Sequence, residues 1–388
     1  MTGQADGFDA RCFTVAQALR RLGHELSVVA VAPVPGARQP AWAAGLPVRE
    51  WVVPQRSGTR FHRLQRLVER VSPIPIGHPA ELGLWRMLSS SGCDLVVFLT
   101  ARRPDLARHI STQLPTILFA EERFFEGPDG WGWAEGRFGE LEATALRHAL
   151  SAVAGLGVIS SLEREWAEQA FDLPAIVVPH SLDDAYWQER SDAPAATLGP
   201  RDVFVIGNFG AHRNAAGLRE VIDRLSADEG ERALRIAVAS GTEAHPLLRD
   251  VPPELLLWLG AIDDPRPYYH SAGATLVPSQ QVRGVKTTVL QGWLTGCPVV
   301  ATDASAASAE GVDGVDLLAS PTPDGLVNAL HRVIRDRELR KRLSRAGSES
   351  YAARHSPRMV DAAVGNLLSL ATTSVGTWRP RESKDGGV

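Results

Sequence analysis

Short apolar runs alternate with longer amphipathic segments along most of this chain of 388 residues. Buried strands are predicted in the first half at 26–31, 95–99, 116–120 and 176–178, with helices near 14–22, 80–90, 104–113 and 140–150. The second half repeats the pattern, with strands near 203–206, 235–239, 257–259, 275–277, 299–301 and 317–318, and helices at 214–225, 287–294 and 326–343. Strands that alternate with helices form parallel sheets with helices on both faces, so the pattern predicts an α/β fold.

A change of composition separates the two halves. Residues 189–200 bring Ser, Asp, Pro, Ala, Thr and Gly together, as interdomain linkers do. We therefore expect two Rossmann-like domains that face a cleft, over 1–185 and 202–371, joined by a linker over 186–201. The polar tail 372–388 is expected to be disordered.

The overall composition disfavours several classes of protein. The chain is 44% hydrophobic and 22% charged, as in soluble globular proteins, and its net charge of −4 argues against nucleic acid as a partner. Cys12, Cys93 and Cys297 are scattered without metal-ligand spacing, which favours a reducing cytoplasm. No apolar run in the sequence reaches the length of a membrane span.

Residues 60–71 form a basic amphipathic segment. Phe61, Leu64, Val68 and Val71 would lie along one helical face, with four arginines mostly elsewhere. Such a helix could contact anionic lipids at the inner face of the membrane. A solvated outer face of an ordinary helix has the same pattern, so both interpretations stay open.

The chain begins with a Gly-rich segment, 3–7, that is typical of the turn between a first strand and a first helix. The preceding strand is missing, although the first strand of a doubly wound sheet normally lies near its centre. Its absence would leave backbone N–H and C=O groups without partners. We therefore expect the natural protein to begin upstream with about five to eight apolar residues. We expect the 388-residue form to be poorly soluble when made alone.

The segment 279–302 predicts a loop, a helix, a Gly-Cys-Pro stop and a buried strand. Arg283 and Lys286 flank the start of this helix, where the helix dipole opposes positive charge by roughly 0.3–1 kcal/mol. The same helix end offers backbone N–H groups to anions, so a diphosphate beside Lys286 would explain the lysine. A lysine whose ammonium group simply reaches solvent is an equally good explanation.

A second turn, G-N-F-G, follows the strand predicted at 203–206 and precedes a helix. Its two glycines would let the backbone approach a phosphate group closely, and the basic residues after it could add charge. An ordinary tight turn explains the glycines about equally well. The candidate ligand-binding residues here are Gly207, Asn208, Gly210, His212 and Arg213.

Three blocks of the second half occur in a specific order and spacing. They are D-V-F-V-I-G-N-F-G-A-H-R-N from Asp202, W-L-G-A-I-D-D-P-R-P-Y-Y-H-S-A-G-A-T-L-V-P-S from Trp258, and G-V-K-T-T-V-L-Q-G-W-L-T-G-C-P-V-V-A-T from Gly284. The blocks resemble the group 1 retaining glycosyltransferases of the GT-B fold, most strongly across 202–355. The N-terminal half is similar more loosely, through Q-A-L-R-R-L-G-H-E-L-S-V-V-A and I-V-V-P-H-S-L-D.

The resemblance implies an enzyme that transfers a sugar from a UDP, GDP or similar donor with retention at the anomeric carbon. It implies a donor bound mainly in the C-terminal domain, an acceptor taken from the N-terminal one, and no metal or other cofactor held by the protein. Cell envelope or secondary metabolite glycosylation would be the setting. Lys286 and Arg213 would stabilise the leaving phosphate, and Thr287 and Thr288 would add hydrogen-bond donors.

Two departures from the family leave the donor and the activity open. Arg283 and Gln291 occupy the positions of two glutamates eight residues apart, the second of which bonds the ribose hydroxyls in the family. The amide of Gln291 can still accept a hydrogen bond but lacks the carboxylate's charge. Glu121 and Glu122 stand where many members place a His-Asp pair, and would line the sugar and acceptor side of the cleft.

Three further residues are candidates on the acceptor side. Trp131 and Trp133 lie in the Gly-rich loop 127–136, which could close over the cleft and stack on an acceptor ring. Tryptophans that cover a neighbouring core edge are the alternative. His180 precedes the linker, where packing at a hinge is as good an explanation as substrate contact.

Two other functions stay open beside the glycosyltransferase. One is a non-catalytic protein of the same fold that binds a nucleotide or a partner protein. The other is a sugar-nucleotide epimerase, which needs acid and base groups that the sequence does not reveal.

Overall fold

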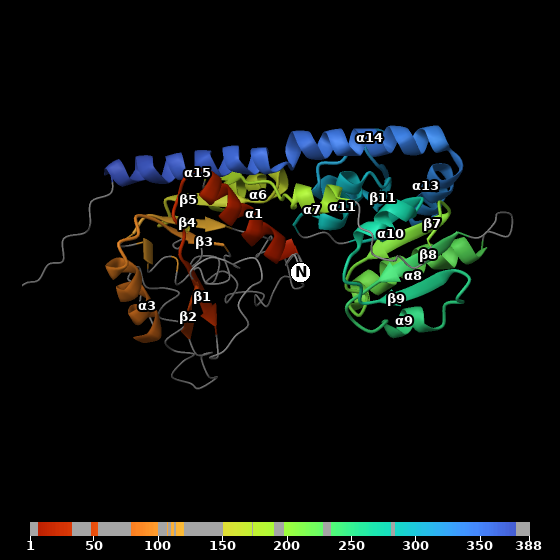
Figure 1. Ribbon diagram of the computed structural model, residues 1–388, viewed down its shortest axis with the longest axis horizontal. Coiled ribbons are helices and arrows are strands. Elements are labelled where there is room, and N and C mark those ends of the chain that lie inside the picture. Colours follow the sequence, from red (N-terminus) through yellow and green to blue (C-terminus); the bar gives the residue numbers. More distant parts are fainter. Residues whose placement is uncertain are drawn as a thin grey trace, which may run out of the picture. The chain divides into compact units, whose positions relative to one another are not determined.

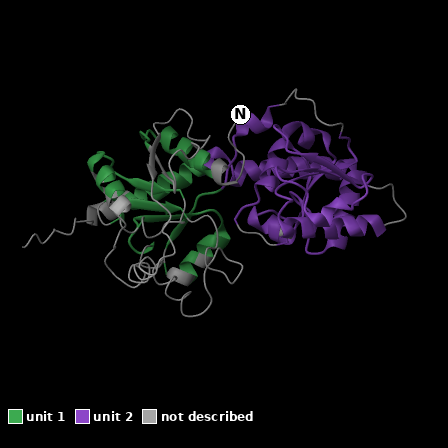
Figure 2. Ribbon diagram, turned by 90° about the horizontal axis from the view of Figure 1, so that it is seen from below, with its two compact units in different colours: residues 1–179, 360–388 green, residues 180–359 purple. Residues whose placement is uncertain are grey.

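The computed structural model describes residues 7–32, 48–52, 79–99, 107, 110–111, 114–119, 150–172, 174–189, 198–227, 234–280 and 284–377. The chain divides into two compact units, which Figure 2 colours separately. Unit 1 comprises Met1–Pro179 and Val360–Val388, and unit 2 comprises His180–Met359. Both units combine parallel strands with helices, so the predicted α/β fold is confirmed.

Unit 2 is built on a six-stranded parallel sheet in the order β12-β11-β10-β7-β8-β9 (Figure 1). Its strands are β7 (Asp202–Ile206), β8 (Arg235–Ala239), β9 (Leu256–Gly260), β10 (Ala274–Val277), β11 (Val299–Thr302) and β12 (Leu318–Ser320). Each of these strands overlaps a strand that was predicted from an apolar run. Continuous apolar runs are typical of strands buried on both faces of a sheet.

Helices cover both faces of this sheet. The helices described in this unit are α7 (Asp184–Gln188), α8 (His212–Ala227), α9 (Pro246–Arg249), α10 (Arg266–Ser271), α11 (Thr287–Thr295), α12 (Asp303–Ser308), α13 (Pro323–Arg335) and α14 (Arg337–Arg354). Val203 of β7 belongs to the core cluster with residues of α8 and α13, whereas the ring of Phe204 stacks on Tyr268 of α10 at 5.4 Å. Successive strand residues point to opposite faces, so α8 and α13 lie on one face and α10 lies on the other.

The helix predicted over 326–343 is instead two helices, α13 and α14, that meet at Asp336. The N–H of Asp336 donates to the carbonyl of Arg332 at 3.0 Å, which ends α13. Its carboxylate accepts the N–H of Leu339 at 2.9 Å, which caps α14. The apolar period continues across the junction, so the break depends on a single capping residue that periodicity does not show.

The described strands of unit 1 form two parallel sheets, β1-β2 and β3-β4-β5-β6. They are β1 (Val28–Ala32), β2 (Val48–Val52), β3 (Val96–Phe98), β4 (Thr116–Phe119), β5 (Gly155–Val158) and β6 (Ala175–Val177). The helices are α1 (Gly7–Arg21), α3 (Pro79–Ser90), α6 (Ser161–Phe171) and α15 (Pro357–Thr377). Among the residues described here, β1 pairs only with β2 and β3 shares its ladder only with β4.

Most of the last helix, α15, belongs to unit 1. Leu367 is 1% exposed and shares a core cluster with Val15 of α1 and Ile117 of β4. A Cβ on Gly155 would lie 2.9 Å from Leu367, and one on Gly157 would lie 3.2 Å from it, so α15 packs directly on β5.

The structure therefore divides the chain differently from the boundaries predicted at 185, 201 and 371. The divisions fall at 179/180 and 359/360, because the chain returns to unit 1 through α15. Residues 186–188 are part of α7 rather than of a linker, and residues 372–377 continue α15 rather than starting a disordered tail.

Leu367→Ala is expected to lower the free energy of unfolding of unit 1 by about 2–5 kcal/mol, because it leaves a cavity between α15 and β5. Leu370 lies on the same helix but is 45% exposed, so Leu370→Ala is the matched control. We expect the control to change stability by less than about 0.5 kcal/mol. Urea unfolding followed by circular dichroism measures both, and equal effects would show that α15 does not pack in this way.

His355 holds the beginning of unit 2 against the end of α14. The ring is 3% exposed, with Nδ1 3.0 Å from the carbonyl oxygen of His180 and Nε2 3.1 Å from that of Ala309. One turn earlier on α14, the hydroxyl of Tyr351 accepts the N–H of Leu182 at 3.0 Å. Burial lowers the pKa of His355, although the two carbonyls oppose this effect.

We expect the stability of unit 2 to depend on pH through His355. Its pKa in the folded state lies below the unfolded value, so the unfolded chain binds more protons as the pH falls below about 6.5. The stability associated with the neutral ring is therefore present above that pH and is lost on acidification. The free energy of unfolding should fall more steeply from about pH 7.5 to about pH 5.5 in the natural protein than in His355→Gln. Parallel pH profiles for the two proteins would contradict this.

Candidate functional site

The candidate site lies at the carboxyl edge of the unit 2 sheet, where the strand order reverses. β7 pairs with β8 on one side and with β10 on the other. Ligands of doubly wound sheets bind outside the carboxyl ends of the strands at such a switch point. The turn after β7 leads into α8, and the turn after β10 leads into α11, so two helix N-termini lie at this edge.

Lys286 is the N-cap residue of α11, which confirms the predicted start of this helix. Its side chain makes no capping hydrogen bond, in contrast to the Ser, Thr, Asp or Asn usual at this position. Its backbone N–H donates to the hydroxyl of Ser308 at 3.1 Å, and its carbonyl accepts the N–H of Val289 at 2.9 Å. The backbone at the start of α11 is thus fixed, with a cation placed against the helix dipole.

Hydroxyl groups at and within α12 bind Ser279, shortly after β10, and Lys286, just before α11. Thr302, the N-cap of α12, and Ser305 both donate to the carbonyl of Ser279, at 2.6 and 3.1 Å. Ser308 donates to the carbonyl of Ser305 at 2.8 Å while it accepts the N–H of Lys286. Sequence reasoning missed these residues, although a threonine directly after a predicted strand is a signal for a helix cap.

The turn after β7 is bound by the turn after β8. The N–H of Phe209 donates to Ser240 Oγ at 3.3 Å, and the N–H of Gly210 donates to Thr242 Oγ1 at 3.0 Å. A Cβ on Gly210 would lie 2.8 Å from that threonine oxygen, so the glycine permits this close approach. Thr242 also donates to the side-chain oxygen of Asn208 at 3.2 Å. The N–H groups of Phe209 and Gly210 both donate to hydroxyl groups of the protein, so the tight-turn interpretation explains Gly210.

The other residues of this turn lie close to β8 as well. The N–H of Gly207 donates to the carbonyl of Ala239 at 3.1 Å, which extends the ladder between β7 and β8. His212 is the exposed first residue of α8, and its ring lies 5.2 Å from that of His245. His245 Nδ1 accepts the N–H of Leu247 at 3.3 Å, so its ring can offer a proton only from Nε2.

Thr287, Thr288 and Gln291 lie on the first turns of α11. Thr287 and Gln291 are four residues apart and therefore share a helix face. Gln291 Oε1 accepts a hydrogen bond from the hydroxyl of Tyr269 at 2.8 Å. Sequence reasoning did not anticipate Tyr269, which lies on α10 and is 1% exposed.

Several predicted site residues lie outside the described residues, and the segment 60–71 does too. These residues are Arg283, Glu121, Glu122, Trp131 and Trp133. The backbone of Arg213 lies in the first turn of α8, but its side chain is not among those described. His180 is 4% exposed at the start of unit 2, an environment that supports packing rather than contact with a substrate.

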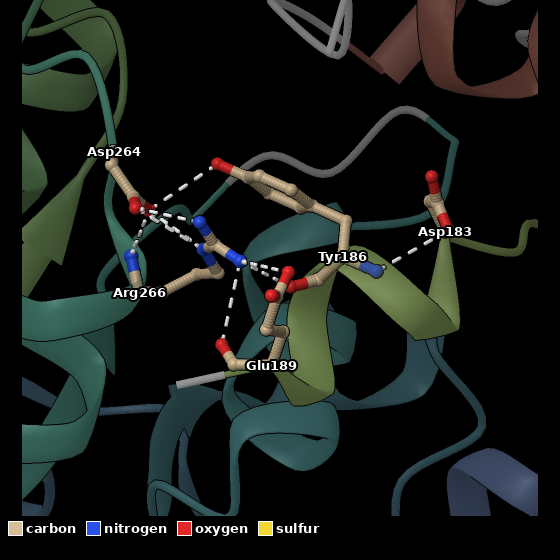
Figure 3. A network of polar contacts seen from close by, with 5 residues as sticks. All are labelled: Asp183, Tyr186, Glu189, Asp264 and Arg266. Carbon is tan, nitrogen blue, oxygen red and sulfur yellow. Dashed lines mark hydrogen bonds and ion pairs between the residues drawn. The ribbon is translucent and has the colours of Figure 1, made fainter. Parts of the chain in front are cut away.

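A polar network at the carboxyl end of β9 joins α7 to the turn before α10 (Figure 3). Arg266 donates from Nε to Asp264 Oδ1 and from Nη2 to Asp264 Oδ2, both at 2.9 Å, and from Nη1 to the carbonyl of Tyr186 at 2.8 Å. The guanidinium carbon lies 4.0 Å from the centroid of the Tyr186 ring. The hydroxyl of Tyr186 in turn donates to Asp264 at 3.3 Å. Arg266 therefore contacts Asp264 through hydrogen bonds from Nε and Nη2, and Tyr186 through a hydrogen bond and the stacking of its guanidinium group on the ring.

Arg266→Ala is expected to lower the free energy of unfolding of unit 2 by about 1.5–3 kcal/mol, because it leaves Asp264 without its charged donors. Arg266→Lys keeps the charge but loses the planar fork, so we expect an intermediate loss. Arg345 forms an exposed ion pair with Glu349 on α14, so Arg345→Ala is the control and should change little. Guanidinium unfolding measures all three, and equal effects of Arg266→Ala and Arg345→Ala would contradict a structural role for the network.

Comparison with known proteins shows what part of this unit is similar to. Residues 200–336 match the sequence model of the glycosyl transferases group 1 family. No curated protein sequence matches the chain significantly. Among solved structures, a glycosyltransferase from Rickettsia africae has a TM-score of 0.71 at 10% identity, with 96% of each chain covered.

Two further structures have the same fold. HepE from Anabaena, in complex with UDP, has a TM-score of 0.67 at 14% identity over 95% of this chain and 98% of its own. Sucrose-phosphate synthase from Thermosynechococcus elongatus has a TM-score of 0.68 at 14% identity over 93% of this chain and 92% of its own.

Residues 200–336 are therefore similar to the group 1 glycosyltransferases, and the chain shares the GT-B fold of these solved structures. This confirms the resemblance inferred from the three sequence blocks. In the part of the chain that the structure describes, no helix is long and apolar enough to cross a membrane.

Proposed function

We propose that this protein is a glycosyltransferase that moves a sugar from a nucleoside diphosphate to an acceptor, with retention and without a metal held by the protein. The observation that carries the proposal is the position of Lys286 at the N-cap of α11, at the switch point of a group 1 domain. Structures of the similar Anabaena HepE contain UDP and UDP-glucose, which supports a nucleotide sugar as the donor.

The diphosphate of the donor is proposed to lie against the start of α11. The N–H groups of Thr287 and Thr288 and the ammonium group of Lys286 would bind its oxygens through charge-assisted hydrogen bonds. Arg213, at the start of α8, would add a second cation at the same edge. Charge on the diphosphate grows as its bond to the sugar breaks, so these donors bind the transition state more strongly than the ground state.

Retention can follow from this arrangement without a nucleophile of the protein. The bond between the anomeric carbon and the diphosphate oxygen breaks, and the acceptor oxygen bonds to the same face of that carbon. The acceptor's proton passes to the departing diphosphate. The protein then has to position the two substrates and stabilise charge. Glu121 and Glu122 are proposed to line the sugar and acceptor side.

A second candidate is a protein that binds a nucleotide sugar without transferring the sugar. Gln291 favours it, because an amide stands at the position where the family carries a charged carboxylate. Incubation of the purified protein with a panel of nucleotide sugars and analysis of the products separates the two. Transfer or slow donor hydrolysis supports the enzyme, binding without turnover supports the second candidate, and formation of sugar isomers would indicate an epimerase.

Lys286→Ala is expected to weaken the binding of a nucleoside diphosphate by about tenfold to a hundredfold, through the loss of a charged hydrogen bond worth about 1.5–3 kcal/mol. The fold should keep its stability, because the helix dipole opposes this cation. Titration calorimetry and thermal melting measure the two effects.

Lys341→Ala is the matched control, since Lys341 is an exposed lysine of the same unit that pairs with Glu338. Its removal should leave the affinity unchanged. Unchanged affinity in Lys286→Ala would show that Lys286 does not contact the phosphates. Equal losses of affinity in the two variants would indicate a general effect of charge.

A further inference from the structure

The hydrogen bond between Tyr269 and Gln291 determines what Gln291 can offer to a ligand. The tyrosine ring is 1% exposed and packs edge-on against Phe204 at 4.9 Å and Trp187 at 6.0 Å, so it cannot turn away. Burial raises the pKa of its hydroxyl well above the usual value, so the hydroxyl keeps its proton. The oxygen of the Gln291 amide therefore already has a donor, and this contact sets the orientation of the amide.

The place of Gln291 on α11 indicates which part of a nucleotide it meets. It lies on the same helix face as Thr287, about 6 Å further along the axis at 1.5 Å per residue. A diphosphate bound at the start of α11 would place the neighbouring sugar of the nucleoside, rather than a phosphate, beside this residue. Gln291 is half-buried, so part of its side chain can still be reached.

A carboxylate and this amide would recognise that sugar differently. A carboxylate can accept hydrogen bonds from both ribose hydroxyls, so a nucleotide that lacks the 2′-hydroxyl loses a charge-assisted hydrogen bond. With its oxygen engaged by Tyr269, the Gln291 amide offers a ligand its N–H groups and at most one uncharged lone pair. Either ribose hydroxyl oxygen can accept such a hydrogen bond, and the 3′-hydroxyl, which 2′-deoxyribose retains, is sufficient.

We infer that this site does not require the 2′-hydroxyl, so that 2′-deoxyribonucleoside diphosphates, including thymidine diphosphate sugars, belong to the class of donors it accepts. The inference rests on the proposed function, because it assumes that a nucleoside diphosphate binds at the start of α11. It assigns Gln291 as the residue that determines this specificity and Tyr269 as the residue that positions it.

Calorimetric titration with nucleotides matched in their base, UDP with 2′-deoxy-UDP and GDP with 2′-deoxy-GDP, tests the inference. For the better-bound base, the natural protein should bind the two members of a pair within about fivefold of each other. Gln291→Glu should raise the preference for the ribonucleotide by about tenfold or more, since a charged hydrogen bond is gained. Repulsion between the new charge and the diphosphate affects both members of a pair, so the ratio of affinities is the readout.

A preference above about fivefold for the ribonucleotide in the natural protein would overturn the inference and leave the proposed function standing. An unchanged ratio in Gln291→Glu would overturn the role of Gln291. Absence of binding by every nucleoside diphosphate would overturn the proposed function and the inference together.

Two further variants separate positioning from general effects. Tyr269→Phe frees the amide oxygen, so the preference for the ribonucleotide should rise several-fold, whereas a purely structural tyrosine would change both affinities equally. Gln169→Glu makes the same substitution at an exposed position of α6 and should leave the ratio at its natural value. A rise in that control equal to the rise in Gln291→Glu would assign the effect to net charge and overturn the inference.

Discussion

The parallel pairing of β7 with β10 is the contact on which the candidate site depends. Neighbouring strands that run in the same direction end at the same edge of the sheet, so the turns that follow them can contact the same ligand. Thr275 of β10 strengthens the pairing, because its hydroxyl donates to the carbonyl of Phe204 at 2.9 Å. Gly273 precedes β10, where a Cβ would collide with the carbonyl of Pro200. A glycine at position 273 therefore allows β10 to begin next to β7 without a steric clash.

Much of the fold could be predicted because its signals are local. Buried parallel strands are continuous apolar runs, and all six strands of unit 2 were predicted from them. β5 was missed, because its glycines at 155 and 157 are disfavoured in strands. They make sense only opposite Leu367 and Phe119, which come from α15 and β4. The membership of α15 in unit 1 depends on the same distant contacts, so no local pattern could reveal it.

For the candidate site, too, the local features could be predicted from the sequence and the contacts between distant residues could not. The start of α11 at Lys286 was predictable, since a cation at a helix N-terminus is visible in the sequence. The partners that shape the site were not, because they are polar contacts between separate elements. Ser308 contacts Lys286 from α12, and Tyr269 contacts Gln291 from α10. Each contact depends on how two helices lie on the sheet, and a hydroxyl residue in isolation does not specify its partner.

The hydrogen bonds around α11 also limit the chemistry that this part of unit 2 can perform. Thr302 and Ser305 donate their hydroxyl protons to the carbonyl of Ser279, and the oxygen of Gln291 is engaged by Tyr269. In the proposed complex, the first turns of α11 then offer a ligand N–H groups, the hydroxyl groups of Thr287 and Thr288, and a cation. Such groups stabilise an anion but cannot remove a proton from an acceptor hydroxyl. In the proposed reaction the departing diphosphate takes that proton, so the proposal requires no base from α11.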